Sequence, residues 1–129
     1  MENAELVRRL YERFNAGDFA PRDLVADDFE LFDPDLPGGG VFRGPDGLAD
    51  YLGQYAEAWE EYRIEVEEVR EAGDRVLALL HHVGRGKGSG VESELRDAHV
   101  WTVKDGLARR WRTYLDPAEA LRDVGLPPE

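Results

Sequence analysis

The chain has 129 residues, of which 42% are hydrophobic, so it fits a single globular domain, residues 1–129, with a core of its own. Its 28 acidic and 16 basic residues give a net charge of −12, which argues against nucleic acid and anionic membranes as partners. It contains no cysteine, which excludes disulfides, thiolate catalysis and cysteine metal sites.

The first third of the chain predicts a helix, a shorter helix and a brief strand. Apolar residues recur at helical spacing from Leu6 to Phe14, and Gly17 ends this first helix. Pro21 is tolerated in a first helical turn, so we expect it to open a short second helix. Residues 29–33 alternate like a strand, and the proline- and glycine-rich residues 35–40 predict a loop.

A longer helix and a strand follow. Gly44-Pro45-Asp46 favours a helix start, and an apolar face continues from Leu48 to Trp59. Residues 62–66 alternate as a strand. The apolar pattern then shifts to Val69, which predicts a β-bulge near Glu67-Glu68.

The second half of the chain predicts three more strands. Gly73-Asp74 turns the chain into an apolar strand at 76–83, and the glycines between 84 and 90 leave the register of the next pairing loose. Asp105-Gly106 is a strong hairpin signal, because both turn residues tolerate a positive φ. A short tail helix follows Asp116-Pro117.

The hairpin around Asp105-Gly106 carries the most unusual side chains. Because successive strand residues point to opposite faces, one set of residues from each strand shares a face of this hairpin. The two sets are Leu95, Asp97, His99 and Trp101 on the first strand, and Arg109, Trp111, Thr113 and Leu115 on the second. An acid, an imidazole and two indoles that face the same way predict a ligand site.

The order of these elements predicts an α+β fold. Successive strands joined by short turns pair antiparallel, and helices grouped early in the chain pack on one face of the sheet. We therefore expect a strongly curved, mixed and largely antiparallel sheet of about five strands. The main helices, three in number, would pack on its concave face around a pocket.

Four short motifs accompany this order of elements. They are Asn15-Ala16-Gly17-Asp18 after the first helix, Phe32-Asp33-Pro34 at the end of the first strand, Phe42-Arg43-Gly44 before the long helix, and Asp105-Gly106 in the last hairpin. Together they resemble the nuclear transport factor 2-like superfamily, and within it the SnoaL-like polyketide cyclases and ketosteroid isomerase. The resemblance covers nearly the whole chain and implies a cone-shaped fold with a pocket between helices and sheet. It implies function only weakly, because this fold hosts isomerases, cyclases, hydrolases, dehydratases and non-catalytic binders.

The resemblance also implies candidate catalytic positions. Asp33 falls where ketosteroid isomerase keeps its general base, and His99 falls where that enzyme keeps a protonated Asp that donates to the oxyanion. The oxyanion tyrosine of its first helix corresponds to Leu10, with Tyr11 next to it. Because the other two positions differ, the resemblance does not imply a strict ketosteroid isomerase.

Each candidate acid has a structural alternative. Asp33 is either a base at the mouth of an apolar pocket or a turn-initiating residue that bonds the backbone. In the first case, partial removal from water would make its carboxylate a stronger base. Asp97 and His99 are two residues apart on a strand, so both can reach one ligand. Alternatively, Asp97 forms a structural pair with a side chain of a neighbouring strand, such as His82.

The histidines do not predict a metal site. His81 and His82 are consecutive on a strand and face opposite sides, so they cannot bind one ion together. If the hairpin turns near Gly88-Ser89, His82 lies opposite Leu95 and points into the pocket. The sequence has no His-x-x-x-His spacing, and we expect neither a metal nor another cofactor.

Aromatic and polar side chains at helical or strand spacing are candidates for the pocket lining. Such aromatic stripes more often belong to the core, but a buried hydroxyl needs a partner and can donate to a substrate carbonyl. The candidate catalytic residues are Asp33, Asp97 and His99. The candidate substrate-binding residues are Tyr11, Phe14, Phe32, Tyr51, Tyr55, Trp59, His82, Trp101, Trp111 and Thr113.

Two hypotheses about function follow. The first is a small SnoaL-like enzyme that abstracts a proton next to a carbonyl of a hydrophobic compound, leading to isomerisation or aldol-type ring closure without a cofactor. Asp33 or Asp97 would be the base, and His99 with Tyr51 or Tyr55 would stabilise the enolate. The second is a non-catalytic module that binds a hydrophobic ligand or dimerises. An unpaired carboxylate facing a void favours the enzyme, whereas two hydrogen-bonded carboxylates favour the module.

The expected protein partner is a second copy of the chain. Val83, Ala98, Val100 and Thr102 alternate onto the outer face of the sheet, where we expect no helix to cover them. Such a patch predicts a homodimer through that face, as the resemblance also implies. Charged residues from Glu2 onward and the lack of a long apolar segment favour a cytoplasmic chain without membrane contact.

Overall fold

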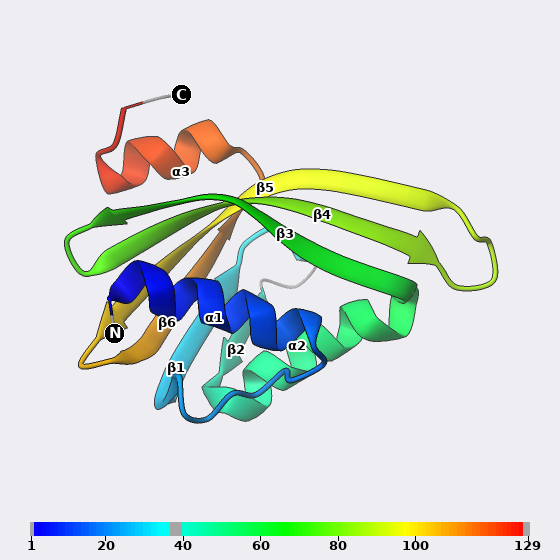
Figure 1. Ribbon diagram of the computed structural model, residues 1–129, viewed down its shortest axis with the longest axis horizontal. Coiled ribbons are helices and arrows are strands. Elements are labelled where there is room, and N and C mark those ends of the chain that lie inside the picture. Colours follow the sequence, from blue (N-terminus) through cyan, green and yellow to red (C-terminus); the bar gives the residue numbers. More distant parts are fainter. Residues whose placement is uncertain (1, 37–39, 128–129) are drawn as a thin grey trace.

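The computed structural model describes residues 2–36 and 40–127, with helices on both sides of one bent sheet (Figure 1). The helices of the described residues are α1 (Asn3–Asn15), α2 (Gly44–Ala58) and α3 (Pro117–Val124). The strands are β1 (Val25–Asp33), β2 (Gly40–Arg43), β3 (Trp59–Ala72), β4 (Arg75–Gly86), β5 (Glu92–Lys104) and β6 (Leu107–Tyr114). Among the described residues, no helix is long and apolar enough to cross a membrane.

The sheet is mixed and largely antiparallel, as the sequence predicts. Its strands lie in the order β2-β1-β6-β5-β4-β3. β1 pairs parallel to β6, and the other neighbouring strands pair antiparallel. In the described part of the chain the sheet has six strands where about five were expected, and the added strand is β2. The two end strands do not pair with each other, so the sheet forms an open cone of the predicted α+β class.

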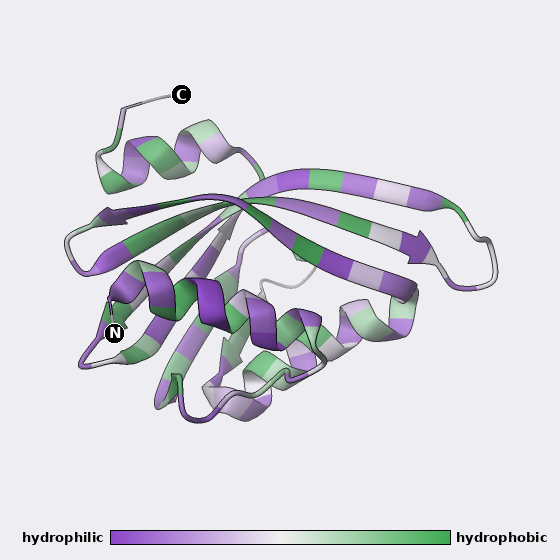
Figure 2. Ribbon diagram, in the orientation of Figure 1, coloured by the Kyte–Doolittle hydropathy of each residue, from purple (hydrophilic) through white to green (hydrophobic). Residues whose placement is uncertain are grey.

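The apolar face of α1 covers the concave side of the sheet. Figure 2 shows hydrophobic and hydrophilic residues alternating along this helix, as expected of an amphipathic helix. Its buried residues are Leu6, Val7, Leu10, Tyr11 and Phe14. They pack in one cluster with the indoles of Trp101 and Trp111. Full burial of one large apolar side chain stabilises the fold by about 1.5–3 kcal/mol, so this cluster supports the cone.

α3 lies on the opposite face of the sheet from α1 and α2 (Figure 1). Ala120, Leu121 and Val124 pack against an outer-face cluster that includes Ala98 and Val100. The sequence analysis gave the short tail helix no place in the fold, and the structure puts it on the outer face. The expectation that no helix covers Ala98 and Val100 is wrong, because these residues are 0% and 7% exposed in a single chain. The smaller apolar patch weakens the argument for a homodimer, which stays a prediction.

The predicted short helix after Pro21 is wrong. Residues 22–24 form a single turn, in which the amides of Leu24 and Val25 donate to the Pro21 carbonyl at 2.9 and 3.1 Å. The turn does not continue, because the Leu24 carbonyl accepts from the Ala108 amide of β6 at 2.8 Å. This bond commits the following residues to β1.

The predicted loop at 35–40 does not extend to Gly40. Gly40 already belongs to β2, which pairs antiparallel with the end of β1, and residues 37–39 lie outside the described residues. β2 could not be recognised in the sequence, because a four-residue strand that begins with glycine carries too little alternation.

The predicted bulge is confirmed, and the structure settles the hairpin register that the sequence left open. The pairing of β3 with β4 shifts between Val66 and Glu68. β4 pairs with β5 so that His82 lies opposite Leu95. This register places His82 on the concave face, diagonal to Asp97.

Candidate functional site

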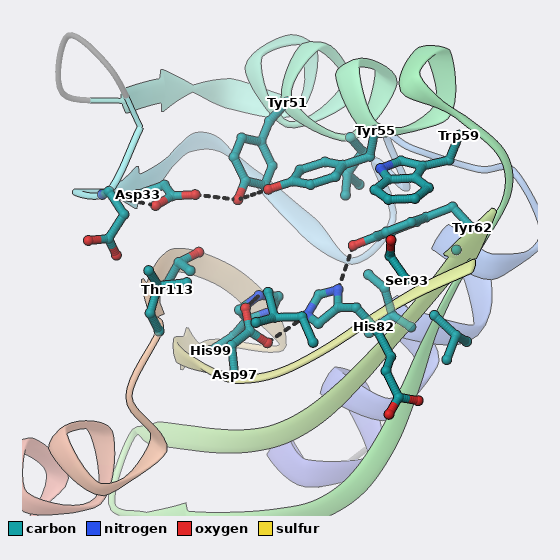
Figure 3. Close-up of a pocket in the computed structure, with 18 of the residues that line it drawn as sticks. Asp33, Tyr51, Tyr55, Trp59, Tyr62, His82, Ser93, Asp97, His99 and Thr113 are labelled. Atoms are coloured by element: carbon teal, nitrogen blue, oxygen red, sulfur yellow. Dashed lines mark hydrogen bonds and ion pairs between the residues drawn. The ribbon is translucent and has the colours of Figure 1, made fainter. Parts of the chain in front are cut away.

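A cavity of about 310 Å³ lies between α2 and the concave face of the sheet (Figure 3). This volume is at the lower end of the range for small-molecule sites, about 300–1,000 Å³. Most of its wall is aromatic or aliphatic, with a few buried polar groups. The polar and aromatic lining residues considered below are Asp33, Tyr51, Tyr55, Trp59, Tyr62, His82, Asp97, His99, Trp111 and Thr113.

One hydrogen-bond network, the Asp33 network, consists of Tyr55, Tyr51 and Asp33. The Asp33 carboxylate is buried and accepts from the Asp35 amide at 3.2 Å and from the Tyr51 hydroxyl at 2.6 Å. Since Tyr51 gives its only proton to Asp33, the Tyr55 hydroxyl, 3.2 Å away, donates to the Tyr51 oxygen. Asp33 therefore combines both predicted features: it bonds the backbone and it lines the cavity.

A second network, the Asp97 network, consists of Tyr62, His82, Asp97 and His99. His82 Nε2 lies 2.5 Å from Asp97 Oδ1, and His82 Nδ1 lies 2.5 Å from the Tyr62 hydroxyl. Burial raises the pKa of Tyr62 above its usual value, so the hydroxyl keeps its proton and donates to Nδ1. The proton of a neutral His82 then lies on Nε2 and is donated to Asp97.

His99 approaches the same carboxylate from the other side. Its Nε2 lies 3.6 Å from Asp97 Oδ2, and its Nδ1 lies 2.7 Å from the Tyr11 hydroxyl. Trp101 Nε1 donates to that hydroxyl at 2.8 Å, so Tyr11 has its own proton left to donate to His99. Burial raises the pKa of Tyr11 and lowers the pKa of His99, so both are neutral near pH 7. The His99 proton is therefore on Nε2, facing Asp97.

Asp97 is ionised in this arrangement. Burial acts to raise the pKa of Asp97, but the nearby His99 imidazole and the His82 hydrogen bond outweigh burial and hold the pKa well below its usual range. A carboxylate with a strongly lowered pKa is a weak base. Asp97 is thus better suited to orient His82 and to stabilise its protonated form than to take a proton from a substrate.

His82, Asp97 and His99 are also a group that could hold a metal ion. Their ligand atoms lie within 4.8 Å of one another, although the sequence predicts no such convergence. However, His82 Nε2 and Asp97 Oδ1 are only 2.5 Å apart. Two ligands of a tetrahedral zinc ion, with bonds of about 2.0–2.2 Å, lie roughly 3.3 Å apart. The pair is therefore arranged to share a proton, and an ion would have to separate the two side chains.

The structure brings most of the predicted site residues to the cavity and leaves four outside it. Those that line it are Asp33, Tyr51, Tyr55, Trp59, His82, Asp97, His99, Trp111 and Thr113. Those that do not are Tyr11, Phe14, Phe32 and Trp101.

The four residues outside the cavity have other contacts. Tyr11, Phe14 and Trp101 belong to the core behind the cavity, and the ring of Phe14 stacks on Trp101 with centroids 6.3 Å apart. Phe32 is on the outer face, because alternation along β1 turns it away from the neighbouring buried residues. There the Arg112 guanidinium lies 5.5 Å from the centre of its ring. These positions argue against direct substrate contacts by the four side chains.

Tyr62 is the main cavity residue that the sequence analysis did not single out. Alternation along β3 places it on the same face as Ile64, which pairs with His82. Tyr62 itself pairs with Gly84, where an added Cβ would come within 2.9 Å of the Trp59 ring. The position of Tyr62 could have identified it. Tyr62 lies on β3 two residues before Ile64, and Ile64 is the residue that pairs with His82.

The open α+β cone with an internal cavity defines a protein of the NTF2-like class. Residues 7–111 match the SnoaL-like domain family, and the chain belongs to that family, which includes polyketide cyclases and isomerases. This confirms the resemblance seen in the sequence. No curated protein matches the chain.

Solved structures show the same fold. An NTF2-like protein of unknown function from Burkholderia pseudomallei is 27% identical with a TM-score of 0.75, over 96% of this chain and 98% of that one. A candidate SnoaL-like polyketide cyclase from Jannaschia is 21% identical with a TM-score of 0.76, over 98% of this chain and 93% of that one. A protein with a ketosteroid isomerase-like fold from Catenulispora acidiphila, in complex with trimethylamine, is 18% identical with a TM-score of 0.76, over 98% and 96%.

Proposed function

We propose that this protein is a cofactor-free acid–base enzyme that removes a proton next to a carbonyl group of a hydrophobic small molecule. The observation that carries the proposal is the Asp97 network, in which a carboxylate holds one nitrogen of His82 while the other faces Tyr62 in the cavity wall. A carboxylate in this position orients an imidazole and stabilises its protonated form. Imidazole is also the side chain that titrates nearest neutral pH, which suits it to exchange protons.

His82 is the proton acceptor in this proposal. The substrate proton passes to the Tyr62 oxygen as the Tyr62 proton moves to His82 Nδ1, which leaves an enolate in the cavity and an imidazolium beside Asp97. Return of the proton to a different carbon isomerises the substrate. Attack of the enolate carbon on a second carbonyl instead closes a ring, and the new alkoxide takes the proton. A positioned base of this kind contributes about 10²–10⁴-fold in rate.

The Asp33 network supplies a donor for the enolate oxygen. Tyr55 donates to Tyr51 over 3.2 Å, a long bond that its hydroxyl can exchange for a bond to a substrate oxygen. Tyr51 is held by Asp33 at 2.6 Å and stays in place. His99 has both ring nitrogens directed at protein groups, so in this proposal it positions Asp97 and does not stabilise the enolate directly.

A binding module without catalysis is the second candidate. The observation that favours it is that both buried carboxylates are hydrogen-bonded, Asp33 to Tyr51 and Asp97 to His82, so neither is unpaired toward the void. The complex of the Catenulispora acidiphila protein with trimethylamine supports small-molecule binding by proteins of this fold. The two candidates share the cavity and differ in whether a proton is moved.

Exchange of carbonyl-adjacent protons in D2O separates the two candidates without knowledge of the natural substrate. A panel of hydrophobic ketones, such as 2-tetralone, is followed by proton NMR with and without the protein. We expect the protein to accelerate exchange and His82→Gln to lower the rate by about 10²–10⁴-fold. The matched control is His81→Gln, because His81 lies next to His82 but bonds Glu94 at 3.0 Å on the outer face.

Two results would contradict the enzyme proposal. The first is an equal loss of exchange in His81→Gln and His82→Gln, which would show a structural effect. The second is ketone binding, detected through quenching of tryptophan fluorescence, without accelerated exchange by the wild-type protein. That second result would favour the binding module.

A further inference from the structure

The fixed charges around the cavity have one sign. The described lining residues include carboxylates but no lysine or arginine. Asp33 and Asp97 are each only 4% exposed, and Asp35 lies at the rim. Glu94 also touches the cavity, but its carboxylate bonds His81 on the outer face at 3.0 Å. Because buried charges are ordinarily paired with an opposite charge, this lining leaves a place for a cation.

The Asp33 carboxylate has neutral partners. Its two oxygens accept from the Tyr51 hydroxyl and from the Asp35 amide. Within residues 2–36 and 40–127, no lysine or arginine lies at ion-pair distance from Asp33. Hydrogen bonds therefore disperse its negative charge without neutralising it.

The Asp97 carboxylate is compensated by at most one positive charge. Its partners are His82 and His99. His99 stays neutral near pH 7 because burial lowers its pKa. Only His82 can offset Asp97, so whichever form His82 takes, the charge of Asp33 remains unbalanced in the cavity.

The wall of the cavity that faces Asp97 is aromatic. The rings of Tyr55 and Tyr62 stack with centroids 5.3 Å apart, and Trp59 lies 6.4 Å from Tyr62. Figure 3 shows these three side chains along one side of the cavity, opposite His82 and Asp97. The electron-rich faces of tyrosine and tryptophan attract cations within about 6 Å. A cationic group in the cavity would thus meet both carboxylate charge and aromatic rings.

We propose that the cavity selects ligands in which a protonated amine or quaternary ammonium group is attached to an apolar body. The cation lies toward Asp33, and the apolar body packs against the aromatic wall. The same charges reject carboxylates and phosphates. This inference names the substrate class of the cavity used in the proposed function; it rests on that cavity being the binding site, and not on proton transfer within it.

Three soluble probes of nearly equal size test the charge preference. They are 2-phenylethylamine, which is protonated at neutral pH, 2-phenylethanol, which is neutral, and phenylacetate, which is an anion. Isothermal titration calorimetry with the wild-type protein measures each affinity. We expect the amine to bind about tenfold or more tightly than the alcohol, and the acid to bind most weakly.

A pair of variants separates the cavity charge from the acidity of the whole molecule. Asp33→Asn removes the charge and keeps the size of the side chain, so the preference for amine over alcohol should fall to about twofold or less while alcohol affinity is retained. Asp27→Asn on the same strand removes the same net charge from an exposed position, and the preference should remain. If Asp33→Asn does not fold, the wild-type comparison of the three probes decides alone.

Several outcomes would overturn the inference. They are equal binding of amine and alcohol, tighter binding of phenylacetate, no detectable binding of the amine, or an equal loss of preference in Asp27→Asn and Asp33→Asn. Failure of the enzyme proposal is distinguishable from these outcomes. Amine binding without ketone proton exchange would contradict catalysis alone, and exchange on ketones without an amine preference would contradict the ligand class alone.

Discussion

Replacement of Tyr11 by phenylalanine removes one hydroxyl that satisfies two buried groups. The hydroxyl accepts from Trp101 Nε1 at 2.8 Å and donates to His99 Nδ1 at 2.7 Å. Tyr11, His99 and Trp101 are 1%, 2% and 0% exposed, so water cannot take the place of the hydroxyl. Tyr11→Phe therefore leaves a donor and an acceptor without partners in the core.

The expected loss of stability follows from these two groups. A buried polar group without a partner costs about 1–3 kcal/mol, and removal of the buried hydroxyl recovers part of that cost. We expect Tyr11→Phe to lower the free energy of unfolding by about 2–4 kcal/mol, a large fraction of the roughly 5–15 kcal/mol of a typical domain. Urea denaturation at pH 7, with similar slopes for both proteins, measures the difference.

Tyr55→Phe is the matched control, because Tyr55 is only half-buried and makes one long hydrogen bond of 3.2 Å. Its loss should be no more than about 1 kcal/mol. If Tyr11→Phe costs no more than Tyr55→Phe, the Tyr11 hydroxyl does not hold His99 and Trp101 as described, and the assignment of the His99 proton to Nε2 loses its basis.

Three more predictions concern acid stability, metal removal and assembly. The pKa of Asp97 is lowered in the folded protein, so its contribution to stability is present above the unfolded value of about 3.9 and is lost as pH falls through the folded value. The difference in unfolding free energy between wild type and Asp97→Asn should therefore shrink toward acid pH, and a constant difference contradicts it. Dialysis against a chelator should leave the melting temperature unchanged, because His82 and Asp97 already share a proton; a drop restored by one divalent ion would show a metal site. Sedimentation at micromolar concentration should give a dimer through the outer face, and the mass of one chain contradicts it.

Part of the candidate site could be predicted from the sequence because strand alternation is a geometric rule. Two-residue spacing placed Asp97 and His99 on one face of the last hairpin, and Trp111 and Thr113 beside them. The position of His82 depended on the hairpin register, which the glycines at 84–90 left open until the pairing with Leu95 was seen.

Other features depend on contacts that no local pattern records. The role of Tyr62 arises from the pairing of β3 with β4, which brings its hydroxyl to His82. The proton positions follow from Trp101, a core residue that donates to Tyr11 and so determines what Tyr11 can offer His99. The position of α3 depended on which side of the sheet the chain took after β6, and the apolar stripe of a short helix fits either face.

The central claim is that His82 donates from Nε2 to Asp97 and accepts from the Tyr62 hydroxyl at Nδ1. Nitrogen-15 NMR of the imidazole rings at pH 7 reports which ring nitrogen carries a proton, and His82→Gln assigns the signals. The account predicts a protonated Nε2 and an unprotonated Nδ1 for His82. A proton on Nδ1, alone or together with one on Nε2, would contradict it, because His82 could then accept no proton from Tyr62.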